Sequence, residues 1–225
     1  MRISYPYDVP LPNGYAATIQ ILRTASAMAA AGHAITLWTA PRAEPPEAVL
    51  SQLGLAPQEG LRLATIFPSR PRSHLLRTPV SRLRLRLASG WTDADVVVSR
   101  GETGFVLASA LARWRRRPPF VYEVHRLLAA GGAETLLGRS LTSEEPLPRR
   151  FVPLRRAEAR AMAAADGFIF LTDAVRDAAC AEFGCDAPAV VAPSGEGCAL
   201  RIGRVDAGGP RQAGNARHQG VNRAG

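Results

Sequence analysis

The sequence predicts an α/β fold in which helices flank a parallel β-sheet. Short apolar runs bounded by Gly, Pro or polar residues alternate along the chain with stretches of helical periodicity, which is typical of βαβ units. The 225 residues are 47% hydrophobic, enough to bury a sizeable core in one large domain or two small ones. No run approaches the roughly 18 apolar residues of a membrane span, and the N-terminus lacks a signal-peptide layout. We therefore expect a cytoplasmic protein.

The first βαβ unit spans residues 2–40. An apolar run at 3–7 predicts a strand, a loop with Pro, Asn and Gly follows, and a second buried strand is expected at 34–39. Between them, Gly32 supplies the usual glycine signal for the end of a helix. The apolar face of that helix repeats at helical spacing and comprises Ile21, Leu22, Ala25, Met28 and Ala29. The crossover of such a unit is right-handed.

The loop of this unit is a candidate anion site, with Asn13, Gly14 and Tyr15 as its binding residues. A helix that starts just after the loop points its free N–H groups back at it, which favours a phosphate or diphosphate. Gly14 would let a ligand approach the backbone closely. The alternative is that Asn-Gly is only a turn, because the three-glycine fingerprint of dinucleotide folds is absent.

The rest of the chain continues the alternation of strands and helices. Further strands are expected at 61–67, 95–99, 120–124, 168–171 and 190–192. Further helices are expected at 46–53, 105–116, 155–165 and 174–183. Residues 100–104 are expected to form a glycine-bearing loop, and residues 127–150 an irregular, mobile one.

Polar residues follow two of the predicted strands. Arg100 and Glu102 come after the strand at 95–99, while Glu123 lies near the end of the strand at 120–124 and His125 follows that strand directly. Open α/β sheets bind ligands at the carboxyl ends of their strands, so all four are site candidates. A histidine with an acid two residues before it can act as an acid or base or bind a phosphate. The alternatives are a capping or surface role for Glu102 and a structural role for His125.

The chain is strongly basic. Its net charge is +9, every basic residue is arginine, and six arginines without an acid occupy residues 70–86. This stretch is either a solvated basic face or a patch for an anionic acceptor or an anionic membrane surface. Nucleic acid is disfavoured, because no helix-turn-helix, RNP or zinc motif accompanies the arginines and aromatic residues make up only 6% of the chain.

The three cysteines are Cys180, Cys185 and Cys198. Their number is odd and their spacing is not that of a metal site, so we expect free thiols. We predict no metal and no cofactor.

Three features resemble the N-terminal domain of family 4 glycosyltransferases, which have the two-domain GT-B architecture. The run PLPNGYAATIQILRTASAMAAAGHAITLWTA resembles the start of that domain and includes the family's Gly-His before the second strand, here Gly32-His33. The family's loop usually carries two adjacent glycines, where this chain has Asn-Gly. His125 falls where the family commonly has a histidine close to the transferred sugar. ADGFIFLTDAVRDAACAEFG resembles a later segment in which Thr172 ends a strand and caps a helix.

The resemblance covers about residues 2–198 and implies a Rossmann-like domain at 1–198, the N-terminal half of a GT-B fold. Residues 199–225 hold few large apolar side chains, so we expect a disordered tail. The family's second half, which holds most donor contacts, has no counterpart in this sequence. The tail's composition is typical of GC-rich DNA read out of frame, so we expect a truncated protein from a split or frameshifted gene.

The resemblance therefore implies the acceptor-binding half of a retaining glycosyltransferase, with little or no activity by itself. The implied catalytic residue is His125, and the implied binding residues are Asn13, Gly14, Tyr15, Arg100, Glu102, Glu123 and Thr172. The implied partners are a nucleotide-sugar, a glycan, lipid or small-molecule acceptor, and a separate C-terminal half. One alternative is a non-catalytic Rossmann-like module that binds a nucleotide or anion. Another is an arginine-rich protein of nucleic-acid or membrane surfaces. A dehydrogenase is disfavoured, because no glycine fingerprint or ribose-binding acid stands in register with the first and second strands.

Overall fold

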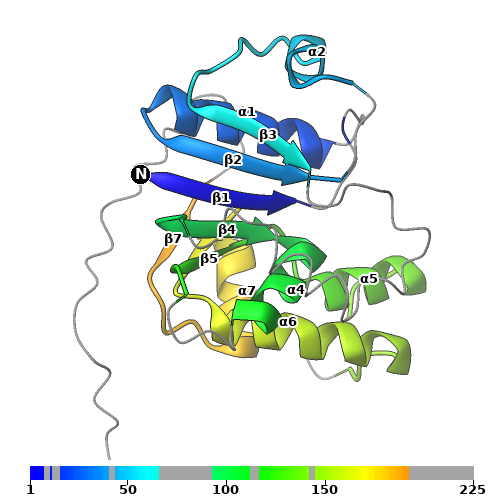
Figure 1. The fold of residues 1–225 in the computed structure, drawn as a ribbon. Coiled ribbons are helices and arrows are strands. Elements are labelled where there is room, and N and C mark those ends of the chain that lie inside the picture. The colour runs from blue at the N-terminus through cyan, green and yellow to red at the C-terminus, as the bar shows by residue number, and fades with distance from the viewer. Residues whose placement is uncertain are drawn as a thin grey trace, which may run out of the picture.

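The computed structural model describes residues 1–7, 11, 16–40, 44–65, 93–111, 117–141 and 145–192. These residues form a seven-stranded parallel sheet of Rossmann-like form in the order β3-β2-β1-β4-β5-β6-β7. Figure 1 shows β3, β2, β1 and β4 side by side. The strands are β1 (Arg2–Tyr7), β2 (Ala34–Thr39), β3 (Leu61–Thr65), β4 (Val96–Arg100), β5 (Phe120–Val124), β6 (Gly167–Phe170) and β7 (Ala189–Val191). The predicted α/β fold is confirmed.

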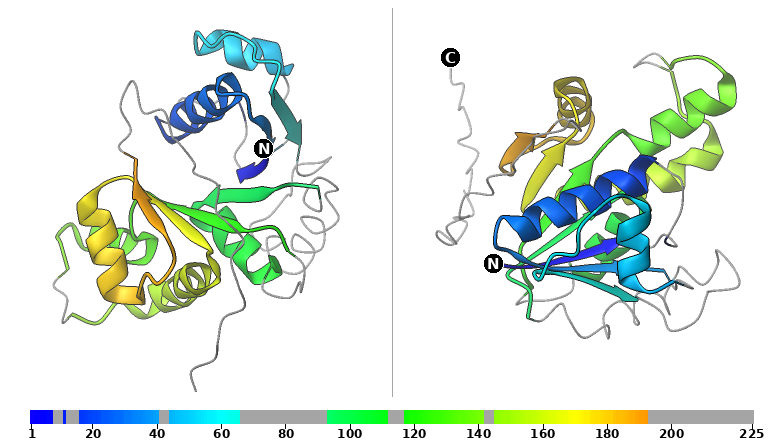
Figure 2. Two further views of the ribbon diagram at one scale, coloured as in Figure 1. Left: turned by 90° about the vertical axis from the view of Figure 1, so that its left-hand side faces the viewer. Right: turned by 90° about the horizontal axis from the view of Figure 1, so that it is seen from above.

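Helices cover both faces of the sheet (Figure 2). They are α1 (Ala16–Ala30), α2 (Pro46–Gln52), α4 (Gly101–Leu111), α5 (Leu128–Leu137), the 3₁₀ turn η2 (Arg149–Phe151), α6 (Val152–Ala164) and α7 (Asp173–Phe183). The chain winds outward from β1 in one direction and from β4 in the other. Right-handed crossovers then place α1 and α2 on one face and α4 to α7 on the opposite face.

Strand alternation divides the apolar side chains between two cores. On the first face, Ile3, Tyr5 and Val98 pack with the buried side of α1. On the second, Val97 and Tyr122 pack with α4, α6 and α7. Successive residues of one strand thus belong to different cores, as the period of two requires.

The start of α4 corrects a sequence prediction. The expected glycine-bearing loop at 100–104 does not exist as a loop, because α4 begins at Gly101, directly after β4. Gly101 has φ +58°, a backbone angle that other residues rarely adopt, and makes the turn from strand to helix. Gly104 lies against the Tyr122 ring, and a Cβ there would be 2.6 Å from its Cε2 atom. Both glycines thus serve the backbone turn and the packing of α4.

The expectation of an irregular loop over 127–150 was wrong at 128–137, where α5 forms, and at 149–150, where η2 begins. Two glycines, normally helix breakers, lie inside α5. Gly132 has a packing reason for being there, since a Cβ at this position would be 2.8 Å from the Phe151 Cε1 atom. The glycine therefore allows α5 to pack closely on η2.

The expectation of three free thiols was also wrong, because Cys180 and Cys185 form a disulfide. Cys180 lies in α7, and Gly184 ends that helix with φ +74°. This turn folds the chain back until the two cysteine Cα atoms are 4.9 Å apart, a distance that suits a disulfide.

Several predictions fall outside the described residues. They concern the candidate anion loop at Asn13, Gly14 and Tyr15, the arginine-rich stretch at 70–86 and the tail at 199–225. Within the ranges that the structure describes, no helix is long and apolar enough to cross a membrane.

Candidate functional site

The candidate site lies at the carboxyl ends of β4 and β5, two neighbouring strands near the middle of the sheet. Arg100 is the last residue of β4, and the strand register sets it beside Glu123 of β5. His125 follows one residue after the end of β5. In parallel sheets this edge is where ligands bind. The structure therefore brings together three of the residues that the sequence predicted.

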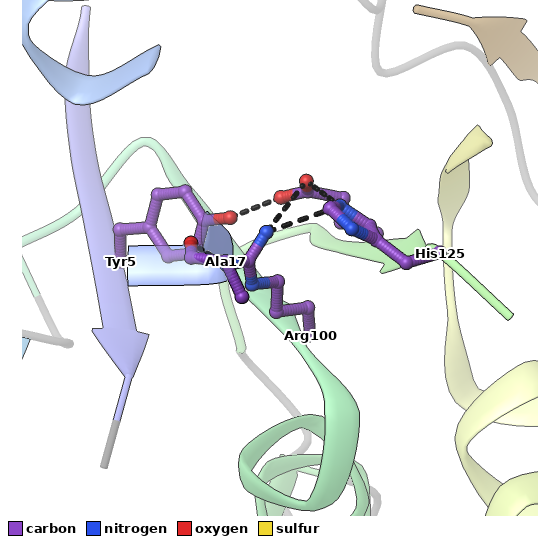
Figure 3. Close-up of polar contacts among 5 residues, drawn as sticks. Tyr5, Ala17, Arg100 and His125 are labelled. Carbon is purple, nitrogen blue, oxygen red and sulfur yellow. Dashed lines mark hydrogen bonds and ion pairs between the residues drawn. The ribbon is translucent and has the colours of Figure 1, made fainter. Parts of the chain in front are cut away.

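Arg100, the last residue of β4, contacts residues from three other parts of the molecule (Figure 3). Its Nη1 atom lies 3.4 Å from Glu123 Oε1 and 3.1 Å from His125 Nε2. Its Nη2 atom donates a hydrogen bond to the carbonyl oxygen of Ala17, in the first turn of α1. The guanidinium carbon also lies 4.9 Å from the centre of the Tyr7 ring, a cation–π contact. Arg100 thus ties β1, α1 and β5 together at the edge of the sheet.

Arg100, Glu123 and His125 form a cluster of polar side chains. Glu123 is the acceptor at its centre. Its Oε2 atom accepts a hydrogen bond from the Tyr5 hydroxyl, and its Oε1 atom contacts both Arg100 and His125 Nε2. Burial raises the pKa of the Glu123 carboxyl. The His125 hydrogen bond, the Arg100 charge and the Tyr5 hydrogen bond together outweigh burial and leave that pKa below its usual value. Glu123 is therefore a buried carboxylate that keeps its charge.

The cluster is buried except at His125. The side chains of Arg100 and Glu123 are 6% and 10% exposed, whereas that of His125 is 23% exposed. Buried charges need partners, and here every charge has one. His125 is the member that a molecule arriving at this edge can reach, and its imidazole can donate or accept a hydrogen bond.

Two other predicted residues lie at the same edge of the sheet. Glu102 is exposed in the first turn of α4. Thr172 follows β6, and its hydroxyl accepts a hydrogen bond from Val175 N at 3.2 Å, which caps α7. The contact that the structure gives Thr172 is thus a helix cap.

Sequence reasoning missed Tyr5 and Tyr7 of β1, which contact Glu123 and Arg100, respectively. Both sit two residues apart in a strand, so they share a face, and that spacing was the available signal. Their contacts with Glu123 and Arg100 depend on the strand order β1-β4-β5, which local sequence patterns do not reveal.

Sequence reasoning also missed Glu158, a buried acid in α6. Its carboxylate accepts hydrogen bonds from Leu128 N at 2.7 Å and Ala129 N at 3.3 Å. The N-cap residue of α5, Leu127, has no capping side chain of its own. Glu158 therefore caps α5 from a neighbouring helix, and so anchors the chain three residues after His125. Burial raises the pKa of Glu158, although the two backbone hydrogen bonds oppose that shift.

We found no metal site among the described residues, since no three His, Cys, Asp or Glu side chains there gather closely enough to hold an ion.

Three solved structures share the fold of this chain. Sucrose-phosphate synthase from Thermosynechococcus elongatus is 13% identical, with a TM-score of 0.55 over 85% of this chain and 47% of its own. Anabaena Alr3699/HepE, in complex with UDP and glucose, is 16% identical, with a TM-score of 0.52 over 87% of this chain and 44% of its own. LpCGTa in complex with UDP is 18% identical, with a TM-score of 0.54 over 85% of this chain and 52% of its own.

The chain spans about half the length of these three proteins. They are GT-B glycosyltransferases, and the seven-stranded domain is consistent with the N-terminal domain of that fold. No curated protein sequence matches the chain. The sequence profile described as Glycosyltransferase Family 4 matches residues 17–195, which is most of the chain. This match confirms the resemblance seen in the sequence, and the chain belongs to Glycosyltransferase Family 4.

Proposed function

We propose that this chain forms the acceptor-binding half of a retaining glycosyltransferase that uses a nucleotide-sugar donor. The observation that carries the proposal is the buried cluster of Arg100, Glu123 and His125 at the ligand-binding edge of the sheet. Membership of Glycosyltransferase Family 4 supports transfer of a sugar as the reaction.

The cluster suits a substrate that carries hydroxyl groups. His125 offers one partly exposed imidazole, while Arg100 and Glu123 are buried behind it and hold it in place. A group fixed in this way can orient a hydroxyl without being reorganised when the substrate binds. We assign His125 to contact with the sugar or the acceptor, and Arg100 and Glu123 to positioning His125.

Two of the similar structures were solved with UDP, one of them also with glucose. This supports a nucleoside diphosphate sugar as the donor class. Because the chain covers about half of those proteins, we propose that a second domain supplies most donor contacts. In the completed cleft, the acceptor oxygen forms a bond to the anomeric carbon as the bond from that carbon to the diphosphate breaks. The acceptor's proton passes to the departing phosphate oxygen. Orientation and stabilisation of the diphosphate charge supply most of the acceleration.

Binding measurements on the full chain test this proposal. Saturation-transfer NMR against a panel of glycosides should detect sugars that contact the chain, and H125A should abolish that contact. Calorimetric titration with UDP should show weak or no binding, and incubation with nucleotide sugars should give no steady product. Tight UDP binding without any sugar contact would refute the proposal in favour of a nucleotide-binding module. Steady turnover by the chain alone would refute the assignment to one half of an enzyme.

A further inference from the structure

The Nε2 atom of His125 has two neighbours, one that can only accept a hydrogen bond from it and one that can only donate a hydrogen bond to it. Glu123 Oε1 lies within hydrogen-bond distance of this atom, and Arg100 Nη1 lies 3.1 Å from it. A carboxylate can only accept a hydrogen bond, and a guanidinium can only donate one. In a neutral imidazole, Nε2 either carries the proton or accepts one. The two neighbours therefore favour different tautomers of His125.

The surroundings of Glu123 decide between the two tautomers. Glu123 is ionised, because the Tyr5 hydroxyl and Arg100 both donate to it and its pKa lies below the usual value. An unprotonated Nε2 would set its lone pair against the lone pairs of a charged carboxylate. Arg100 has other partners, namely the Ala17 carbonyl oxygen, Glu123 itself and the Tyr7 ring. The proton is therefore better placed on Nε2, where it is donated to Glu123.

This assignment leaves Nδ1 as the ring nitrogen with a free lone pair. Both contacts of the His125 ring use Nε2, and Nδ1 has no hydrogen-bond partner among the described residues. We propose that Tyr5 and Glu123 are positioning residues that hold His125 in its Nε2-protonated tautomer, so that Nδ1 accepts a hydrogen bond from a sugar hydroxyl of the substrate. The proposal rests on the function proposed above, which makes a sugar the ligand.

Tyr5 fixes the direction of the carboxylate. It lies on β1, fully buried on the α1 face of the sheet, and its hydroxyl reaches Glu123 Oε2. With Oε2 held there, Oε1 is left to face the histidine ring. Burial is the main reason that the Tyr5 pKa lies well above its usual value of 10.0, so the phenol remains a donor at neutral pH. Tyr5, Glu123 and His125 thus form a chain of donors and acceptors that starts in the core.

Imidazole ¹⁵N NMR of the full chain, labelled at its four histidines, tests the tautomer directly. The His125 signals are assigned by their loss in H125A. In the wild-type chain, with the ring neutral, we expect a protonated Nε2 and an unprotonated Nδ1. A wild-type spectrum with the proton on Nδ1 overturns the proposal, whatever any variant does.

Variants of Glu123 separate positioning from mere packing. E123M removes the acceptor and leaves Arg100 as the neighbour of Nε2, so the proton should move to Nδ1. E123Q keeps an oxygen that can accept from Nε2 and should keep the wild-type tautomer. A folded E123M chain with an unchanged tautomer overturns the proposal.

Variants of Tyr5 remain informative if E123M does not fold. Y5F loses the hydroxyl that orients Glu123 and should give a mixture of both tautomers. Y122F is the matched control, because Tyr122 is a buried tyrosine next to Glu123 in sequence but belongs to the opposite core. It should leave the tautomer unchanged. A pure Nε2-protonated spectrum in Y5F removes Tyr5 from the proposal.

Two substitutions of His125 test which nitrogen meets the sugar. The amide of Asn can take the place of Nδ1, and that of Gln the place of Nε2. In the saturation-transfer experiment, H125N should keep more of the sugar contact than H125Q, and the reverse order overturns the assignment of Nδ1.

The proposed positioning chain and the proposed function fail in different ways. A wrong tautomer with an intact sugar contact refutes only the positioning chain, whereas the right tautomer without any sugar contact refutes the proposed function.

Discussion

Two ion pairs at opposite ends of β4 join the same kinds of groups in different surroundings. At the amino end, Arg2 Nη2 and Asp95 Oδ1 are 3.3 Å apart, with side chains 62% and 45% exposed. At the carboxyl end, Arg100 Nη1 and Glu123 Oε1 are 3.4 Å apart, with side chains 6% and 10% exposed. The two pairs have nearly the same distance between their charged atoms, but they differ in exposure to water.

The difference in exposure gives the two pairs different effects on stability. Water can replace either partner of an exposed pair, so such a pair adds little stability. A buried pair must offset a large loss of hydration, and apolar side chains of similar size often stabilise a fold at least as well. The buried pair survives here with help from Tyr5, His125 and the Ala17 carbonyl oxygen. Stability alone does not call for this arrangement, which agrees with a role in binding.

The largest effect should come from breaking the buried pair. E123A leaves the Arg100 guanidinium buried without its main counter-charge and should lower the free energy of unfolding by about 3–5 kcal/mol. Urea denaturation followed by circular dichroism measures this loss. The double variant R100M/E123M removes both charges and should recover much of the stability. A loss near zero for E123A would contradict the buried character of the pair.

A smaller loss of stability is expected when the carboxylate that caps α5 is removed. E158A removes the acceptor for Leu128 N and Ala129 N and should cost about 1–2 kcal/mol. Hydrogen exchange should also rise in the first turn of α5 before it rises elsewhere. T172A, which removes the exposed cap of α7, is the control and should leave exchange in α5 unchanged. Equal exchange in E158A and wild type would show that α5 does not need this cap.

The two buried glutamates should respond to pH in opposite directions. The Glu123 pKa is lowered in the folded protein, so the stability from its ionisation is lost as pH falls through that lowered value. The Glu158 pKa is raised, so stability is fully present below its usual value of 4.5 and is lost as pH rises through the raised value. On acidification, the stability of wild type relative to E123Q should fall and that relative to E158Q should rise. Urea titrations of the three proteins at a series of acidic pH values measure these differences. If both differences in stability changed with pH in the same direction, the environments described for Glu123 and Glu158 would be wrong.

The smallest effect should come from the exposed pair. D95N removes the charge at the amino end of β4 but keeps an oxygen for Arg2 N, which donates to Asp95 Oδ2 at 2.7 Å. We expect the urea midpoint of D95N to match that of wild type at neutral pH. A large fall in that midpoint would mean that exposure does not distinguish the two pairs.

Local sequence patterns predicted most of the fold. The strands at 34–39 and 120–124 have the predicted bounds, because apolar runs and a preceding Gly or Pro mark them clearly. The ends of the predicted strands also marked Arg100, Glu123 and His125 as site candidates, and the structure places them side by side. The α5 helix was missed because its two glycines look like breakers until Phe151 is seen against one of them.

The remaining errors concern contacts between side chains that local sequence patterns do not reveal. Tyr5 lies 118 residues before Glu123, and only the order of the strands makes them partners. Glu158 caps a helix that precedes it in the chain, so no local capping signal marks it. The disulfide depends on the backbone turn at Gly184, which the cysteine spacing does not reveal.

We propose above that the buried cluster presents His125 to the substrate. A direct test joins the chain to the part of Anabaena Alr3699/HepE that lies outside the matched region and measures initial rates of sugar transfer. In that joined protein, H125A should lower kcat/KM by about 100-fold or more without changing UDP affinity. H33A is the control, because His33 precedes β2 at the opposite edge of the sheet, and it should leave kcat/KM unchanged. Equal kcat/KM values for H125A and H33A would contradict a contact between His125 and the substrate.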